Sequence, residues 1–194
     1  MSEYTTINIL DMLEVIGEEG VNLILSDFSC PKNVEIETFI RKNAIDFARR
    51  KMSVTHLVIN EYGKLAAIFA LTHKAVKIQD NILSSALKKK IKRYAQLDEE
   101  TNSYMVSAFL IAQFGKNYDE GIEDTLSGNS LMDNAMDILA LVQREVGGGV
   151  VYLECEDNPK LISFYQNDNN CFRVFGERYS ERDQTKYIQL LRFF

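Results

Sequence analysis

The alternation of apolar and polar residues along the chain predicts a mixture of helices and strands. Helices are expected where apolar residues recur every three or four positions, over about residues 7–16, 34–48, 81–96, 130–146 and 158–167. Strands are expected in apolar or alternating runs bounded by turn residues, over about residues 21–28, 54–60, 64–78, 104–116, 150–154, 172–179 and 186–194. The second and third strands, and likewise the last two, are expected to form antiparallel hairpins.

The most apolar strand, 104–116, is expected to be central and buried on both faces. A long polar loop, a helix and the apolar strand 150–154 follow it. This order predicts a mixed α/β (α+β) fold, with a strand-helix-strand-helix run between antiparallel hairpins. No internal repeat or linker interrupts the 194 residues, so residues 1–194 are expected to form a single domain.

Composition narrows the class of protein. A hydrophobic content of 46% and a charged content of 26% are ordinary for a soluble globular protein. No apolar run approaches the roughly 20 residues of a transmembrane helix, and the N-terminus lacks the features of a signal peptide. The three scattered cysteines are typical of reduced thiols, and the two histidines lack zinc-ligand spacing. A cytoplasmic protein with no membrane contact and no metal is expected.

The net charge of −6 predicts repulsion of nucleic acid and of anionic membranes, so nucleic acid is not expected as a partner. The run Lys88–Arg93, which holds five basic residues, is the exception. A charge run on an amphipathic helix is usually a solvated face. Contact of this run with nucleic acid stays open as the alternative.

Residues 113–131 combine an apolar strand end, a polar loop and a glycine just before a helix. The first N–H groups of a helix have no partner within it, so such a start can hold an anion. Gly128 lies at this start, between Ser127 and Asn129. The simpler interpretation of the same three residues is a turn with a helix cap.

A second pattern, Asn158-x-x-Leu161-x-x-Phe164-Tyr165, follows the apolar strand that ends at Cys155. Together with the strand-loop-glycine-helix segment before it, this pattern resembles the GNAT superfamily of acyl-CoA N-acyltransferases. The resemblance implies a mostly antiparallel central sheet, flanked by helices and splayed at its central strands. It also implies that the chain is an enzyme with acetyl-CoA as its co-substrate.

The resemblance assigns roles to individual residues. The backbone of the strand end would contact the pantetheine arm and the thioester through Phe114, Gly115 and Lys116. The helix start would hold the CoA pyrophosphate through Gly128, Asn129, Ser130 and Leu131. Asn158 would contact the pantetheine arm, and Tyr165 would be the general acid. Thr125 stands where the family usually has a basic or amide residue.

The implied reaction is direct attack of an amine on the thioester in a ternary complex, without an acyl-enzyme. A thioester is already electrophilic, so alignment and one N–H donor to its carbonyl supply much of the catalysis. Tyr165 would protonate the departing thiolate. The residues leave the general base open between Glu154, Glu156 and a water relay. The expected acceptor is a small-molecule or peptide amine.

The N-terminal half has a looser resemblance to the GNAT toxins of bacterial toxin–antitoxin pairs. It rests on Phe28-Ser-Cys30 and on the helix from Val34 to Ala44, with Pro31 in place of the toxins' glycine. This resemblance implies acetylation of aminoacyl-tRNA, against which the acidic net charge weighs. Two alternatives to the main hypothesis therefore stay open, a toxin-type enzyme of this kind and a GNAT-fold binding module without catalysis.

Two local features remain. The family usually places Gly-Phe about four residues after the tyrosine, so Asn169 or Asn170 is expected to take the left-handed conformation of that glycine. The apolar C-terminus 190–194 suits either core or interface. A homodimer is therefore also open.

Overall fold

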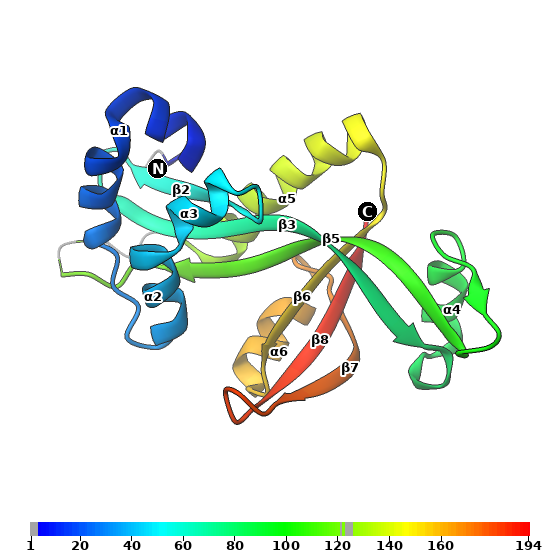
Figure 1. The fold of residues 1–194 in the computed structure, drawn as a ribbon. Helices are drawn as coiled ribbons and strands as arrows, with labels where there is room; N and C mark the ends of the chain where they lie inside the picture. The colour runs from blue at the N-terminus through cyan, green and yellow to red at the C-terminus, as the bar shows by residue number, and fades with distance from the viewer. Residues whose placement is uncertain (1–3, 121, 123–125) are drawn as a thin grey trace. The chain divides into compact units, whose positions relative to one another are not determined.

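Residues 4–120, 122 and 126–194 are described by the computed structural model drawn in Figure 1. In chain order the elements are β1 (Tyr4–Asn8), α1 (Ile9–Ser26), α2 (Val34–Lys42), α3 (Ala44–Arg49), β2 (Val54–Asn60), β3 (Leu65–Gln79), the 3-10 helix η1 (Asp80–Ile82), α4 (Ser85–Ile91), β4 (Leu97–Asp98), β5 (Ser103–Lys116), α5 (Gly128–Val146), β6 (Val150–Glu156), α6 (Pro159–Gln166), β7 (Arg173–Ser180) and β8 (Thr185–Phe193).

The hydrogen-bonded strand order is β1-β2-β3-β5-β6-β8-β7, with β4 paired to β5. This eight-stranded, mostly antiparallel sheet with helices confirms the mixed α+β class. Strands β5 and β6 run parallel and pair at two positions, Phe109↔Val151 and Leu110↔Tyr152. A ladder this short between long strands is the splay expected of the central strands. Both predicted hairpins, β2–β3 and β7–β8, are present.

The chain divides into two compact units. The first comprises the described residues of Met1–Thr72 and Ile111–Ala135, and the second comprises His73–Leu110 and Met136–Phe194. Strands β3 and β5 and helix α5 each contribute residues to both units.

In the first unit, β1, β2 and the start of β3 form an antiparallel ladder, and helices α1, α2 and α3 contact one another beside it (Figure 1). The apolar residues of the helices and strands share one core. It is centred on Ile9, Val21, Leu25, Phe28, Ile40, Ala44, Leu57 and Ile68. The core includes Phe28 and Cys30 of the segment between α1 and α2.

The predicted strand over 21–28 is wrong, because these residues belong to α1 and its C-terminal turn. Val21, Leu25 and Phe28 are fully or almost fully buried and lie four and three residues apart, which is helical spacing. The apolar run VNLIL fits both the period of a helix and the period of a strand. Tertiary packing therefore decides which of the two forms. Gly17, with a φ of 72°, kinks the helix where two separate elements were expected.

The predicted helix over 34–48 is two helices, α2 and α3, which meet at Asn43. Asn33 caps the first, since its Oδ1 accepts a hydrogen bond of 3.1 Å from the N–H of Ile36. The helix expected over 81–96 is shorter than predicted, because only Ser85–Ile91 forms α4.

In the second unit, β6 pairs antiparallel with β8 along its whole length, and β8 pairs with β7. Helix α6 contacts β6 and β7, as Figure 1 shows. The core of this unit collects the apolar residues of β3, α4, β5, β6, β7 and β8. Its largest fully buried members are Ile78, Ile91, Tyr104 and Tyr152.

The expectation that β5 is buried on both faces is wrong for its first half. From Tyr104 to Ala108 buried and exposed residues alternate, and Met105 is 59% exposed. One face of this half therefore packs on the core while the other faces solvent. The central position of the strand within the sheet is as expected.

Candidate functional site

The end of β5 is fixed by the side chain of Asn117, which is 4% exposed. Its Nδ2 donates to the carbonyl oxygens of Asp27 (2.9 Å) and Leu65 (2.8 Å). Its Oδ1 accepts from the N–H groups of Ser29 (2.8 Å) and Asp119 (3.0 Å). One buried amide thus joins the end of β5 to β3 and to the segment after α1. The sequence analysis missed this role.

The three strand-end residues Phe114, Gly115 and Lys116 are the last of β5, and each is partly buried. A Cβ on Gly115 would lie 3.3 Å from two carbon atoms of Ile36 and 3.8 Å from Phe28. A larger residue would therefore push against α2. The close approach of strand and helix explains why a glycine stands here.

Helix α5 begins at Gly128, two residues earlier than predicted. The Oγ of Ser127 accepts a 3.0 Å hydrogen bond from the N–H of Ser130, and its carbonyl accepts one of 3.0 Å from Leu131. Ser127 is therefore a helix cap, as the simpler interpretation of this turn predicted. The Leu131 side chain is fully buried, which leaves only its backbone for a ligand. Asn129 is partly buried, and Thr125 lies outside the described residues.

Helix α6 begins as the sequence predicts. The Oδ1 of Asn158 accepts a 2.9 Å hydrogen bond from the N–H of Lys160, and Pro159 occupies the first helical position. Asn158 thus has a structural role at the exposed start of α6. The contact with pantetheine that the resemblance implies for Asn158 stays a prediction.

Tyr165 lies near the end of α6 and is 7% exposed. Its ring packs edge-on against Phe164 at 5.0 Å and against Phe172 at 5.9 Å between centroids. Burial raises the pKa of Tyr165, and the nearby Cys155 thiol raises it slightly further. The phenol therefore keeps its proton over the whole physiological pH range.

The turn after α6 is closed by Asn170, which is fully buried. Its Nδ2 donates 2.8 Å to the carbonyl of Phe164, and its carbonyl accepts 3.1 Å from Arg192 on β8. The left-handed residue is Cys171, with a φ of 56°, so the expectation of Asn169 or Asn170 in that conformation is wrong. The side-chain amide of Asn170 is buried and bound to Phe164, whereas the exposed Cys171 has the left-handed backbone conformation.

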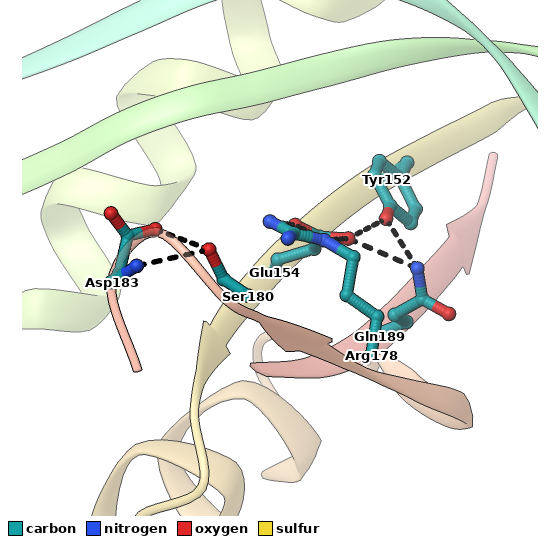
Figure 2. Close-up of polar contacts among 6 residues, drawn as sticks. All are labelled: Tyr152, Glu154, Arg178, Ser180, Asp183 and Gln189. Carbon is teal, nitrogen blue, oxygen red and sulfur yellow. Dashed lines mark hydrogen bonds and ion pairs between the residues drawn. The ribbon is translucent and has the colours of Figure 1, made fainter. Parts of the chain in front are cut away.

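A polar network lies on β6, β8 and β7 (Figure 2). The Nε of Arg178 lies 3.0 and 2.9 Å from the two carboxylate oxygens of Glu154, and its Nη2 lies 2.6 Å from one of them. The hydroxyl of Tyr152 donates to the same carboxylate. Gln189 donates 3.0 Å both to Glu154 and to Tyr152. Glu154 therefore accepts hydrogen bonds from three side chains.

These hydrogen bonds change the chemistry of Glu154. Burial would raise its pKa, but the hydrogen bonds and charge of Arg178, with those of Tyr152 and Gln189, lower the pKa to about 2. A carboxylate of so low a pKa is a poor acceptor of protons near neutral pH. The arrangement argues against Glu154 as the general base. Sequence spacing gave no signal for this network, because its members lie up to 37 residues apart.

The basic run Lys88–Arg93 forms the last turns of α4 and the residues after it. Lys88 forms an ion pair of 2.5 Å with Asp80, and Lys90 lies 5.1 Å from the ring centroid of Phe193. Lys89, Lys92 and Arg93 are exposed. Two side chains of the run, Lys88 and Lys90, therefore contact other residues, and the remaining basic side chains face solvent.

Within residues 4–120, 122 and 126–194, the side chains that could ligate a metal ion are dispersed. No three His, Cys, Asp or Glu side chains come together there as a metal site. In the same residues no helix has the length and apolar content to cross a membrane.

No family model and no curated protein matches the sequence. Solved structures, in contrast, match this chain in fold. A bacterial toxin shares 14% identity over all of this chain and 92% of its own, with a TM-score of 0.64. AtaT in complex with acetyl-methionyl-tRNAfMet shares 14% identity over 95% of this chain and 94% of its own, with a TM-score of 0.65. A tyrosine-to-phenylalanine mutant of KacT shares 13% identity over 96% and 95%, with a TM-score of 0.60.

These neighbours overturn the expectation that nucleic acid is excluded as a partner. AtaT is bound to an acetylated tRNA in one structure, and an AtaT-AtaR complex is bound to DNA in another. The net charge of −6 was a poor basis for that expectation. Binding of a nucleic acid depends on local patches of charge and not on the sum over the chain. The resemblance seen in the sequence is confirmed for the fold, which is that of the GNAT acetyltransferase toxins AtaT and KacT.

Proposed function

We propose that this chain transfers the acetyl group of acetyl-CoA to the amino group of an aminoacyl-tRNA. The observation that carries the proposal is the likeness in fold to AtaT bound to acetyl-methionyl-tRNAfMet, which spans nearly the whole of both chains. A further neighbour of this fold, AtaTR, is bound with acetyl-CoA. The proposed acceptor amine thus belongs to an RNA instead of to a small molecule or a peptide.

Acetyl-CoA would be held through backbone groups. The start of α5, at Gly128–Leu131, offers the N–H groups and the positive end of a helix dipole to the pyrophosphate. On phosphate binding, the N–H of Ser130 would exchange its hydrogen bond with Ser127 for one to a phosphate oxygen. The strand end at Phe114–Lys116, anchored by Asn117, would supply the contacts to pantetheine and to the thioester carbonyl. Asn158 would add a side-chain contact to the pantetheine arm.

In the reaction, the amine nitrogen forms a bond to the thioester carbon and the carbon–sulfur bond breaks. The backbone N–H groups at the end of β5 would stabilise the charge that develops on the carbonyl oxygen. Tyr165 would give its proton to the departing thiolate and regain one from solvent. Burial keeps the phenol protonated, as a general acid requires, and because its pKa is raised above that of a thiol, the proton would move only as the carbon–sulfur bond breaks.

The proton lost by the amine needs only a weak acceptor. An α-amino group has a reference pKa of about 7.7–8.0, so a sizeable fraction is already neutral near pH 7.5. With the pKa of Glu154 held at about 2, water is the acceptor that we propose. A water relay was among the alternatives left open by the sequence.

RNA would be attracted by the exposed cations of the run Lys88–Arg93. Lys89, Lys92 and Arg93 would contact phosphates, while the ion pair of Lys88 with Asp80 joins α4 to the 3-10 helix η1 before it. We also propose a neutralising partner protein of the antitoxin kind. The support is that AtaT has been solved with the C-terminus of its antitoxin AtaR.

The direct test incubates the full chain with labelled acetyl-CoA and a pool of aminoacyl-tRNAs. We expect label on the α-amino group of the charged amino acid, and none with uncharged tRNA. Calorimetry on the Gly128→Trp variant should show loss of acetyl-CoA binding, while Glu61→Trp on the β2–β3 turn should bind normally. A folded wild-type chain that binds no acetyl-CoA and transfers no label would favour the non-catalytic binding module.

A further inference from the structure

Tyr94 directly follows the basic run Lys88–Arg93, and its ring packs against the backbone just before β6. A Cβ at Gly149 would lie 1.9 Å from the Cε1 of this ring and 2.3 Å from its Cζ. Any side chain at position 149 would therefore collide with the tyrosine. The N–H of Tyr94 also donates a 2.8 Å hydrogen bond to the carbonyl of Ile91, the last residue of α4. The glycine thus leaves the space that the ring occupies.

The ring of Tyr94 has a second support in Phe193, the last residue of β8. The two rings are stacked, with centroids 6.1 Å apart and planes inclined by 26°. Phe193 is itself covered by Lys90, whose Nζ lies 5.1 Å from the centroid of its ring. These contacts are in series, because the lysine covers the phenylalanine and the phenylalanine supports the tyrosine. Of the three side chains, only that of Tyr94 is exposed.

Tyr94 stays 42% exposed in spite of its two contacts. An exposed side chain usually loses conformational freedom when a ligand packs on it, and this loss opposes binding. Gly149 and Phe193 already restrict the ring in the free protein, so less freedom remains to be lost. A restrained ring with an open surface is therefore suited to stacking on a planar ligand.

The charge around Tyr94 indicates which planar ligand would bind. Lys89, Lys92 and Arg93 are exposed, and in the part of the chain that the structure describes they form no ion pair. Single-stranded nucleic acid binds where an aromatic ring stacks on a base and cations meet the phosphates. A base inside a duplex is stacked on its neighbours, so only an unpaired nucleotide offers a face to the ring.

We propose that Tyr94 stacks on an unpaired nucleotide of the RNA acceptor, while Lys89, Lys92 and Arg93 meet the phosphates that flank it. This inference rests on the proposed function, because it names a part of that acceptor and the residue that recognises it. It adds a base contact to the phosphate contacts of the basic run. Tyr94 and its two supports, Gly149 and Phe193, all belong to the second unit.

The test uses three variants of the full chain. Tyr94→Ala removes the ring, Tyr94→Phe keeps it, and Gly149→Ala displaces it. The matched control is Tyr62→Ala, which removes a 73% exposed tyrosine on the β2–β3 turn. Fluorescence anisotropy measures the affinity for two labelled RNAs of equal length, a single strand and a blunt-ended duplex. Thermal melts verify that each variant is folded.

Tyr94→Ala should weaken binding of the single strand about 5- to 150-fold, the range for base–aromatic stacking, and change binding of the duplex less than about twofold. Tyr94→Phe should keep most of the affinity, and Tyr62→Ala should keep all of it. Gly149→Ala should also weaken single-strand binding. It should add nothing in the Tyr94→Ala background, because the ring that it displaces is then absent. A full additional loss in that background would contradict the role given to Gly149.

The cations and the reaction have separate readouts. Lys89→Ala should reduce the slope of log K against log salt by about 0.7 on the single strand, as one lost phosphate contact. Lys42→Ala, at an exposed position at the end of α2, should leave the slope unchanged. In acetyl transfer, Tyr94→Ala should raise KM for aminoacyl-tRNA and leave KM for acetyl-CoA unchanged.

Opposite results separate the inference from the proposed function. If acetyl transfer proceeds and Tyr94→Ala leaves KM for aminoacyl-tRNA unchanged, the stacking contact is wrong while the function stands. If the wild-type chain transfers no acetyl group but Tyr94→Ala selectively weakens single-strand binding, the contact stands and the function fails. If wild type and Tyr94→Ala bind the single strand equally, or the variant loses single strand and duplex alike, the contact is wrong in either case.

Discussion

Arg178 binds Glu154 across β8, the strand that separates their own strands, through two of its nitrogens at 2.6–3.0 Å. Its guanidinium therefore holds the outer strand β7 against β6 from one face of the sheet (Figure 2). Glu154 is the less accessible partner, with 14% of its side chain exposed against 45% for Arg178. Removal of the cation would leave a largely buried carboxylate with two hydrogen-bond donors in place of three.

Arg178→Ala should lower the free energy of unfolding by about 1–2 kcal/mol, below the cost of breaking a fully buried pair because Arg178 is half exposed. Urea denaturation measures this change. Arg182→Ala is the matched control on the same hairpin, since the side chain of Arg182 is 95% exposed and 3.9 Å from Asp183. The control should change stability by less than about 0.5 kcal/mol. Equal losses in both variants would contradict the role given to the Arg178–Glu154 pair.

His56 should make the stability of the protein depend on pH. It is 7% exposed, it stacks on Phe69 at 5.0 Å, and burial lowers its pKa to about 4, an effect that the backbone of Val54 and the charge of Asp11 oppose only in part. The pKa in the folded state is below the unfolded value of about 6.5, so the unfolded state binds more protons. The free energy of unfolding therefore keeps its full contribution from His56 above pH 6.5. It falls by about 3 kcal/mol as the pH drops from 6.5 to 4.

Urea denaturation at pH 7, 5.5 and 4.5 tests this dependence. His56→Leu should flatten the fall between pH 6.5 and 4, and it also removes a buried Nδ1 that has no partner among the described residues. His73→Asn, at an exposed position on β3, should leave the fall intact. A wild-type chain equally stable at pH 7 and 4.5 would show that His56 is protonated without penalty. Glu154, with a folded pKa of about 2, contributes stability that is lost only below about pH 4.5.

Tyr165→Phe should lower kcat by about 10²- to 10⁴-fold, the range for loss of a general acid. The affinity for acetyl-CoA should change less than about twofold, since the ring and its packing on Phe172 remain. Because burial raises the pKa of Tyr165, kcat should show no descending limb from this phenol below pH 10. Tyr62→Phe on the β2–β3 turn is the control. Unchanged turnover in the Tyr165 variant would remove this residue from the mechanism.

Two substitutions of Asn158 separate its structural role from a cofactor contact. Asn158→Ala should cost about 1 kcal/mol of stability because it removes a helix cap, whereas Asn158→Ser keeps a capping oxygen. If the amide contacts pantetheine, both variants should bind acetyl-CoA more weakly in calorimetry. Normal affinity in the serine variant would leave Asn158 with the cap alone.

Lys92→Glu should weaken binding of tRNA and reduce the dependence of that binding on salt, because a cation near the phosphates is replaced by an anion. Lys64→Glu makes the same charge change on the β2–β3 turn and should have little effect. Filter binding at two salt concentrations measures both. Identical losses in the two variants would indicate a general effect of charge instead of a contact by α4.

The sequence predicted the elements whose signals are local. Asn33 and Asn158 cap helices where their residue type and the following apolar period indicated, and both hairpins have the expected strands. Those predictions needed only neighbours within a few positions. The strand predicted over 21–28 was wrong because the apolar residues of this run fit the period of a strand and that of a helix. Only packing within the first unit selects the helix.

The candidate site was predictable only in part. The strand end, the start of α5 and the helix with Tyr165 follow from short patterns, but their anchors do not. Asn117 binds groups 52, 88 and 90 residues away, and Arg178 binds Glu154 from 24 residues away. No periodicity relates positions so far apart, so the low pKa of Glu154, and with it the choice of base, could not be predicted from the chain alone.

Asn117 ends β5 with hydrogen bonds that lie wholly within residues 27 to 119. The position of Lys116 is therefore set before the chain leaves the strand, and it does not depend on the length of the connection to α5. A change of chain length beyond Asp119 should therefore leave the register of β5 unchanged.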